Sequence, residues 1–344
     1  MEVVGEEERI GKSCNLEKVI KMELRRREFL KVLSASAAEV LLSGESLWAM
    51  GAKTKLDKQI RDKFPRRTLG KTGERVSIIT FGGIVVRDSE PAHSAEVVAE
   101  AVEKGINYFD VAPRYGDAEE KLGPALKPYR EKVLLACKTW KRQRKEAEEE
   151  LHRSLSRLQT DRFDVYQLHG LTDVEKDVKA ALGKGGAMEV ILEARKQGLV
   201  RYIGFSAHSP EAALTAMWEF DFDTIMYPVS FVTHYKSNFE SEVLAEAKRR
   251  KMGIIGIKPM AKQRWQGEKD KRWPKCWYEP ISERELARKA LSWTLSQGVS
   301  TAVPPGEESL YRLAVELGPI CKAPTGDELL ELEQIAAGCT AIFS

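Results

Sequence analysis

The sequence lacks two features that would define whole classes of protein. A membrane-spanning helix needs about 20 consecutive apolar residues, and no stretch of this chain approaches that length. We therefore expect no membrane-spanning helix. Cysteines are few, and none of them has the C-x-x-C spacing that local zinc or iron–sulfur sites use. The sequence therefore predicts no metal site and isolated free thiols at Cys14, Cys137, Cys276, Cys321 and Cys339.

The sequence also has little excess of charge of one sign. It contains 55 Lys and Arg against 52 Asp and Glu, for a formal net charge of +3. The basic residues alternate with acidic ones, for example between Lys145 and Glu150 and between Glu283 and Arg288, so no basic face for nucleic acid is indicated. Apolar residues make up 42% of the chain, which is enough for the core of an ordinary globular domain.

The first fifty residues are typical of a targeting segment. Two arginines open the stretch Arg26 to Lys31, and a mildly apolar region rich in Ala, Ser and Leu follows from Val32 to Ala52. This resembles a twin-arginine (Tat) export signal, and the small residues Ala49 and Gly51 offer a cleavage site. Met22 is a candidate start. We expect delivery to the periplasm by the Tat export machinery; the alternative is an amphipathic surface helix on a cytoplasmic protein.

From Arg66 onward, turn residues and apolar runs recur regularly. Arg66 to Arg75 holds turn residues between short apolar groups, which predicts a hairpin. Apolar runs typical of strands then follow at Val76 to Phe81, Ile106 to Phe109, Val133 to Cys137, Phe163 to Leu168, Val200 to Phe205, Thr224 to Val229, Gly253 to Ile257 and Val299 to Val303. Helical patterns lie between them at His93 to Lys104, Lys145 to Leu158, Ala187 to Gln197, Glu242 to Lys251 and Glu283 to Ser296.

Eight strand–helix repeats predict an α/β protein in the form of a (β/α)8 TIM barrel, with an N-terminal hairpin and a C-terminal helical extension. A doubly wound open sheet is the alternative, but no G-x-G-x-x-G follows the first strand, as a Rossmann dinucleotide site would require. We expect an N-terminal extension with the signal over 1–52, a linker over 53–65, the barrel over 66–320 and a C-terminal extension over 321–344.

Polar residues end several of the predicted strands. Asp110, Lys138, His169 and Ser206 each stand where the apolar character of a strand stops. The active site of a parallel barrel lies at the carboxyl ends of its strands, so we expect these side chains on one rim. Because a charge near a core needs a partner, Asp110 and Lys138 are expected to pair across neighbouring strands.

At these residues the sequence resembles the aldo-keto reductase family. The matching segments are Phe109 to Gly116 with Glu119 and Leu122-Gly123, Ser154 to Leu158 with Asp161 and Asp164 to His169, and Gly204 to His208. The resemblance implies reduction of an aldehyde or ketone, or the reverse oxidation, with Tyr115 as general acid. It makes Asp110 and Lys138 the pair that lowers the pKa of Tyr115, and His169 the residue that orients the carbonyl.

The same resemblance implies a nicotinamide cofactor. It assigns Ser206 to the carboxamide, the segment Lys258-Pro259-Met260 to the pyrophosphate, and Gly306 to Arg312 to the adenosine end. Arg312 favours NADP over NAD, with NAD still possible, because its guanidinium suits a 2′-phosphate; Glu307 and Glu308 are expected to turn to solvent. The sequence departs from the family pattern at the nicotinamide end, at Ala207, Met226 and Ile257.

Two other functions remain open at this point. Lys138 or Lys258, each at a strand end, could be the amine of a Schiff-base lyase on the same barrel. A non-catalytic subunit that only binds the cofactor is the second alternative, although the set of Asp110, Tyr115, Lys138 and His169 is complete. The partner we expect is a small carbonyl compound. Its identity depends on loop side chains such as the tryptophans between Gln263 and Pro280, which we interpret as part of a substrate lid.

Overall fold

The computed structural model describes residues 64–267 and 272–343. The twin-arginine segment therefore lies outside the described residues, as does nearly all of the predicted linker. The described chain begins with an antiparallel hairpin of β1 (Arg66–Thr68) and β2 (Arg75–Ser77). Its turn contains Gly73, whose positive φ of 77° favours glycine. The predicted hairpin is thus confirmed.

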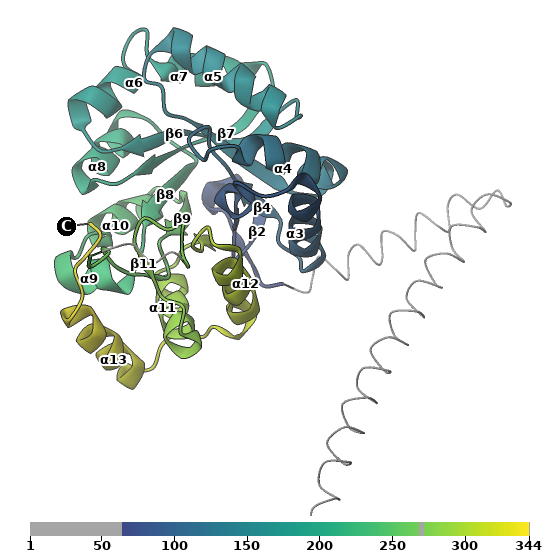
Figure 1. The fold of residues 1–344 in the computed structure, drawn as a ribbon. Helices are drawn as coiled ribbons and strands as arrows, with labels where there is room; N and C mark the ends of the chain where they lie inside the picture. Colours follow the sequence, from purple (N-terminus) through teal and green to yellow (C-terminus); the bar gives the residue numbers. More distant parts are fainter. Residues whose placement is uncertain (1–63, 268–271, 344) are drawn as a thin grey trace, which may run out of the picture. The chain divides into compact units, whose positions relative to one another are not determined.

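Eight parallel strands form a barrel, which confirms the predicted fold class (Figure 1). Neighbours in the sheet follow the order β12-β9-β8-β7-β6-β5-β4-β3. A parallel bridge between Ile79 and Ala302 joins the first and last strands and closes the sheet. The strands are β3 (Phe81–Gly82), β4 (Tyr108–Asp110), β5 (Leu134–Thr139), β6 (Phe163–Leu171), β7 (Val200–Ala207), β8 (Thr224–Pro228), β9 (Gly253–Ile257) and β12 (Thr301–Val303).

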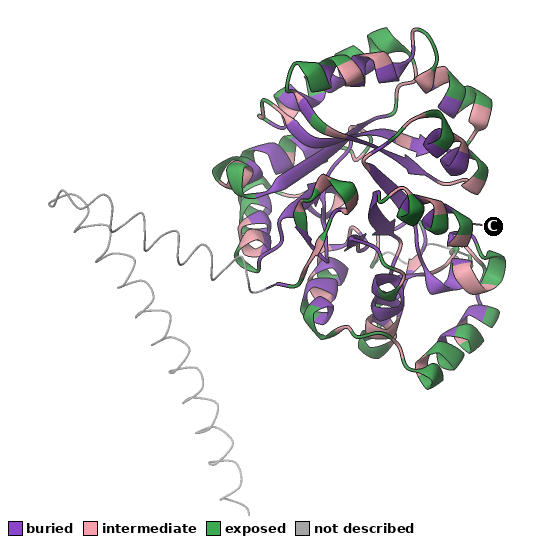
Figure 2. Ribbon diagram, turned by 180° about the vertical axis from the view of Figure 1, so that it is seen from behind, coloured by how far each residue is buried: buried purple, intermediate pink, exposed green. Residues whose placement is uncertain are grey.

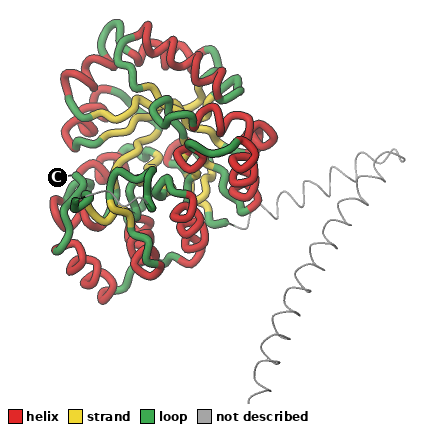
Figure 3. Tube along the Cα trace, in the orientation of Figure 1, coloured by secondary structure: helices red, strands yellow, loops and turns green. Residues whose placement is uncertain are grey.

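Helices surround these strands and turn their apolar faces inward (Figures 2 and 3). Each of the five predicted helical segments is a helix in the structure, with ends that differ by up to two residues from the prediction. The helices are α3 (Pro91–Glu103), α4 (Ala118–Leu126), α5 (Arg144–Arg157), α6 (Ala180–Leu182), α7 (Ala187–Lys196), α8 (Pro210–Glu219), α9 (Phe231–Ser237), α10 (Ser241–Arg249), α11 (Arg284–Ser296), α12 (Glu308–Leu317) and α13 (Gly326–Ala337).

The alternation of side chains along each strand divides the core into two layers. Tyr166 and Leu168 of β6 belong to the large layer between strands and helices. Val165 of the same strand belongs to a small cluster inside the barrel, which also holds Tyr108 and Ile255. Because the residues of a strand point alternately to its two faces, polar residues that continue the inward set arrive at the carboxyl end of the barrel.

The predicted first strand is wrong in its extent. The run from Val76 to Phe81 is divided between β2 of the hairpin and the two-residue strand β3. The reason is that Val76 and Ser77 pair antiparallel with β1, so this half of the run cannot also lie in the parallel sheet. Apolar composition alone does not distinguish these two partners.

The C-terminal extension contains a helix, as expected. Helix α13 starts with a capping box in which Thr325 and Glu328 satisfy each other's backbone N–H groups. Residues 339–342 then run beside β10 (Ala261–Gln263), which pairs with β11 (Glu279–Pro280). Within residues 64–267 and 272–343, no helix is long and apolar enough to cross a membrane. In the same part of the chain none of the four cysteines is in a disulfide, and no cluster of potential metal ligands occurs.

Candidate active site

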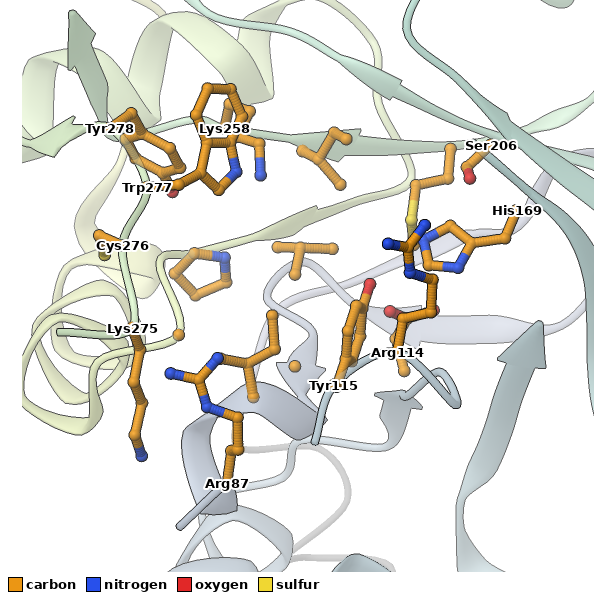
Figure 4. Close-up of a pocket in the computed structure, with 18 of the residues that line it drawn as sticks. Arg87, Arg114, Tyr115, His169, Ser206, Lys258, Lys275, Cys276, Trp277 and Tyr278 are labelled. Atoms are coloured by element: carbon orange, nitrogen blue, oxygen red, sulfur yellow. The ribbon is translucent and has the colours of Figure 1, made fainter. Parts of the chain in front are cut away.

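A cavity of about 400 Å³ opens at the carboxyl end of the barrel strands, within the usual range for small-molecule sites. Six of the predicted catalytic and cofactor residues line it (Figure 4). They come from five different strand ends and are Asp110, Tyr115, His169, Ser206, Lys258 and Gly306. The cavity therefore gathers most of the predicted rim.

Tyr115 lies above a buried ion pair. The Nζ atom of Lys138 is 2.5 Å from Oδ1 of Asp110 and donates a second hydrogen bond of 3.1 Å to the carbonyl of Val111. The same Nζ atom lies 5.4 Å from the centre of the Tyr115 ring. Lys138 is fully buried below the cavity and does not line it. The predicted pairing of Asp110 with Lys138 across β4 and β5 is thus confirmed.

The electrostatics of Tyr115 differ from the expectation. Burial raises the pKa of Tyr115, and the opposing effect of Lys138 does not cancel it. The sequence-based expectation of a lowered pKa is therefore wrong in its net direction, because desolvation of a phenolate outweighs one ammonium that already interacts with Asp110. Burial would lower the pKa of Lys138, but Asp110 and Tyr115 raise it and keep the ammonium charged. Tyr115 is consequently a protonated phenol at neutral pH.

His169, the inward residue near the end of β6, packs edge to face against Tyr115, with ring centroids 5.8 Å apart. Burial, followed by the charge of Lys138, holds the pKa of His169 well below its usual range. The imidazole is therefore neutral at physiological pH, and one of its nitrogens carries a hydrogen that it can donate. Phenol and imidazole together can donate two hydrogen bonds to one oxygen atom placed in the cavity.

A second group of cations lies on the other side of the cavity. Lys258 follows β9 with a φ of 68°, a rare conformation for a residue other than glycine and one that clusters at functional sites. Its Nζ atom lies 5.2 Å from the ring centre of Trp277 and 5.0 Å from that of Tyr278. Burial lowers the pKa of Lys258 to about 8. Lys275 also lines the cavity and donates to the carbonyl of Val85 over 2.7 Å.

Three predicted cofactor residues are placed elsewhere. Pro259 and Met260 are buried behind Lys258 and do not line the cavity. Arg312 does not line it either, because its guanidinium pairs with Glu100 and with Glu308. The expectation that Glu307 turns to solvent is wrong: Glu307 is buried and accepts a hydrogen bond from the backbone N–H of Lys275.

Comparison with known proteins identifies the family. A model of the aldo/keto reductase family matches residues 79–309, a range that includes the cavity and all eight barrel strands, from β3 to β12. This chain belongs to the aldo/keto reductase family.

The sequence identity between this chain and individual similar proteins is low. The aldo-keto reductase YhdN of Bacillus subtilis is 32% identical over 205 residues, 54% of this chain and 58% of that protein. The uncharacterized oxidoreductase YqkF of the same organism is 31% identical over 159 residues, 42% of this chain and 49% of that protein. The chain thus matches about half the length of these curated relatives. The solved aldo-keto reductase AKR11C1 of Bacillus halodurans has the same fold, with a TM-score of 0.64, 20% identity and coverage of 81% and 98% of the two chains.

Several cavity residues of this aldo/keto reductase were not selected from the sequence. Arg87, Arg114, His208 and Lys275 line the cavity, yet they lie in loops without a periodic pattern. For Arg114 a signal was present, since it directly precedes Tyr115. Met226 and Ile257, the departures from the family pattern, both line the cavity, whereas Ala207 is buried outside its lining. The cavity wall next to Ser206 is therefore more apolar than the family pattern implies.

Proposed function

We propose that the protein reduces the carbonyl group of a small molecule with NADPH, and that Tyr115 is the proton donor. The observation that supports this most directly is the stack of Tyr115 over the buried pair of Lys138 and Asp110, next to a neutral His169. When bound, NADPH supplies a hydride to the carbonyl carbon. Negative charge then develops on the carbonyl oxygen, and a preorganised proton donor lowers the barrier.

Each residue of the site has one role in this proposal. The imidazole of His169 donates a hydrogen bond that holds the carbonyl oxygen. The phenol of Tyr115 transfers its proton to the same oxygen as charge develops. The ammonium of Lys138 stabilises the phenolate that remains, and Asp110 keeps that ammonium charged and in place. Since burial raises the pKa of Tyr115, the donor stays protonated throughout the neutral range.

The residues of the cavity fit a phosphate-bearing cofactor. Lys258 makes no ion pair with a carboxylate in residues 64–267 and 272–343, although its side chain lies in the cavity wall. Gly306 lines the cavity directly ahead of α12, and helix N-termini attract phosphate. Lys258 and Lys275 would hold the phosphates, and Ser206 would lie at the carboxamide end. A pyrophosphate carries two negative charges, which Lys258 and Lys275 match. We favour NADP over NAD on the family resemblance and not because of Arg312, which is already paired.

The test of this function is Tyr115→Phe. The variant loses the proton donor but keeps the ring, so NADPH-dependent reduction should fall by about 10²-fold or more, while NADPH affinity stays within about twofold. Tyr235→Phe is the matched control, because the Tyr235 hydroxyl is exposed and bonds to the carbonyl of Leu329 outside the cavity. Wild-type turnover in Tyr115→Phe, measured by NADPH absorbance with an aldehyde panel, would contradict the assignment.

One observation supports a second function, a Schiff-base lyase that uses Lys258. A lysine must lose its proton before its amine attacks a carbonyl, and the pKa of about 8 leaves part of Lys258 neutral at physiological pH. Lys138 is unsuitable because Asp110 keeps it charged. Borohydride treatment in the presence of a carbonyl compound separates the functions: a covalent adduct on Lys258 together with cofactor-independent cleavage would support the lyase. The absence of both would eliminate it.

A further inference from the structure

Arg114 is a cation on the catalytic side of the cavity that the reduction does not use. It lies in the loop between β4 and α4, directly before Tyr115, and it lines the cavity while remaining exposed to solvent. In Figure 4 its guanidinium lies next to Tyr115 and His169, whereas Arg87, Lys258 and Lys275 are on the opposite side. The charge of Arg114 contributes to the lowered pKa of His169, which independently indicates that the two side chains are close.

The position of Arg114 is set by a tryptophan. Its guanidinium lies 4.1 Å from the ring centre of Trp140, and Trp140 packs edge to face on His169 with centroids 5.1 Å apart. The close approach of Trp140 requires Gly170, where a Cβ atom would lie 2.6 Å from the indole and where φ is 66°. Gly170, Trp140 and Arg114 therefore form a chain of contacts that holds the guanidinium beside the reacting residues.

The charge of Arg114 is not compensated by a carboxylate within the described residues, unlike that of Arg142. Arg142 approaches the same tryptophan ring, at 5.5 Å, but is neutralised by Asp177 at 3.0 Å. Arg114 forms no ion pair with a carboxylate within the described residues. The acidic side chain in the cavity lining is that of Asp110, which is paired with Lys138. A guanidinium held on an aromatic face without a counter-ion, at the mouth of a cavity, is suited to bind an anion from solution.

We infer that Arg114 selects carbonyl substrates that carry an anionic group, a carboxylate or a phosphate, beside the carbonyl to be reduced. The inference rests on the proposed reductase function and specifies its substrate class. The cofactor phosphates do not account for Arg114, because the cations assigned to them lie on the opposite side of the cavity (Figure 4). With the anion bound by the guanidinium fork, the carbonyl of the same molecule reaches Tyr115, the next residue in the chain.

The test compares acids with their neutral esters on the NADPH-bound enzyme. The probes are 2-, 3- and 4-carboxybenzaldehyde and their methyl esters, which vary the spacing between anion and aldehyde. For at least one isomer, the acid should exceed its ester in kcat/KM by about tenfold or more, the scale of a hydrogen bond to a charged group. In Arg114→Ala this preference should vanish through a higher KM for the acid, with kcat/KM for the ester within about twofold of wild type.

Two further variants separate the anion site from other roles. Arg114→Lys keeps the charge without the bidentate fork and should retain part of the preference. Arg249→Ala removes an exposed arginine at the end of α10, ahead of β9 and thus at the opposite end of the barrel, and should leave the preference intact. Equal turnover of acids and esters by the wild type would overturn the inference. An equal fall in kcat/KM for the acid and for its ester in Arg114→Ala would also overturn it. So would loss of the preference for the acid in Arg249→Ala.

A binding measurement distinguishes failure of the inference from failure of the reductase function. If no probe is reduced, the proposed function fails, and calorimetric titration of the protein with benzoate and with benzamide, with and without NADP⁺, tests Arg114 directly. Benzoate should bind about tenfold or more tightly than benzamide in the wild type and equally weakly in Arg114→Ala. Equal binding of benzoate and benzamide to the wild type would eliminate the anion site.

Discussion

The affinity for NADPH should fall steeply above pH 8, because Lys258 must be protonated to bind a phosphate. Burial lowers the pKa of Lys258 to about 8, so in the free protein the ammonium is mostly protonated at pH 7 and mostly neutral at pH 9. The pyrophosphate of the cofactor is a diester with no proton to lose near neutral pH, so it stays fully charged over this range. If the bound phosphate keeps Lys258 charged, the Kd for NADPH rises about tenfold from pH 7 to pH 9, or about 1.4 kcal/mol.

Fluorescence titration of NADPH between pH 6 and pH 10 measures this effect. Two variants isolate the lysine: Lys258→Met removes the charge at every pH, and Lys258→Arg keeps it at every pH because a guanidinium does not titrate here. Both should lose the tenfold step, the first with uniformly weak binding and the second with binding nearer to that of the wild type. A wild-type Kd that is the same at pH 7 and pH 9 would refute the assignment of Lys258 to a phosphate.

Four other changes have definite expected outcomes. Replacing Arg26 and Arg27 by Lys should leave the protein in the cytoplasm, because a Tat signal is read by a receptor; unchanged fractionation would count against export by this route. Thr325→Ala removes the cap of α13 and should cost about 1 kcal/mol of unfolding free energy, measured by denaturant titration, whereas an unchanged midpoint would mean that this cap is not stabilising. Gly123→Ala would place a Cβ atom 2.6 Å from the backbone after α5, so it should destabilise by about 1–3 kcal/mol; a wild-type melting temperature would contradict that close contact. Arg312→Ala should leave the ratio of NADPH to NADH affinity within about twofold of the wild-type ratio, because Arg312 already pairs with two glutamates. A tenfold fall in this ratio would show that Arg312 binds the 2′-phosphate.

The positions of the proposed catalytic residues could be predicted because they follow from the periodicity of a parallel barrel. An inward residue at the carboxyl end of a strand must lie in the wall of the cavity or directly below it, whatever the surrounding loops do. Asp110, Lys138 and His169 are such residues, and the structure brings them together below and beside Tyr115. The cofactor end was harder to predict. Arg312 is on a helix, where its partner depends on which neighbouring helix presents an acid, and α3 presents Glu100.

The sign of the pKa shift at Tyr115 also needed the tertiary structure. The sequence places a lysine and an aspartate on neighbouring strands, but it does not show how much solvent reaches the phenol. Likewise, the sheet closes between Ile79 and Ala302, which are 223 positions apart by their numbering. The strand β2 pairs with β1 in the hairpin and not with the barrel, although its apolar run continues into β3.

The sequence by itself determined the eight strand–helix units, the family and the proposed catalytic set, because these depend on patterns within short stretches of chain. Only the tertiary structure decided which charges are neutralised. Arg142 meets Asp177 and Arg312 meets Glu100, both carboxylates from other elements, whereas Arg114 lies on Trp140 and Lys258 lies over two aromatic rings. Ion pairing depends on distances of a few ångströms between residues far apart in the chain, and that proximity is a property of the fold, not of any local pattern.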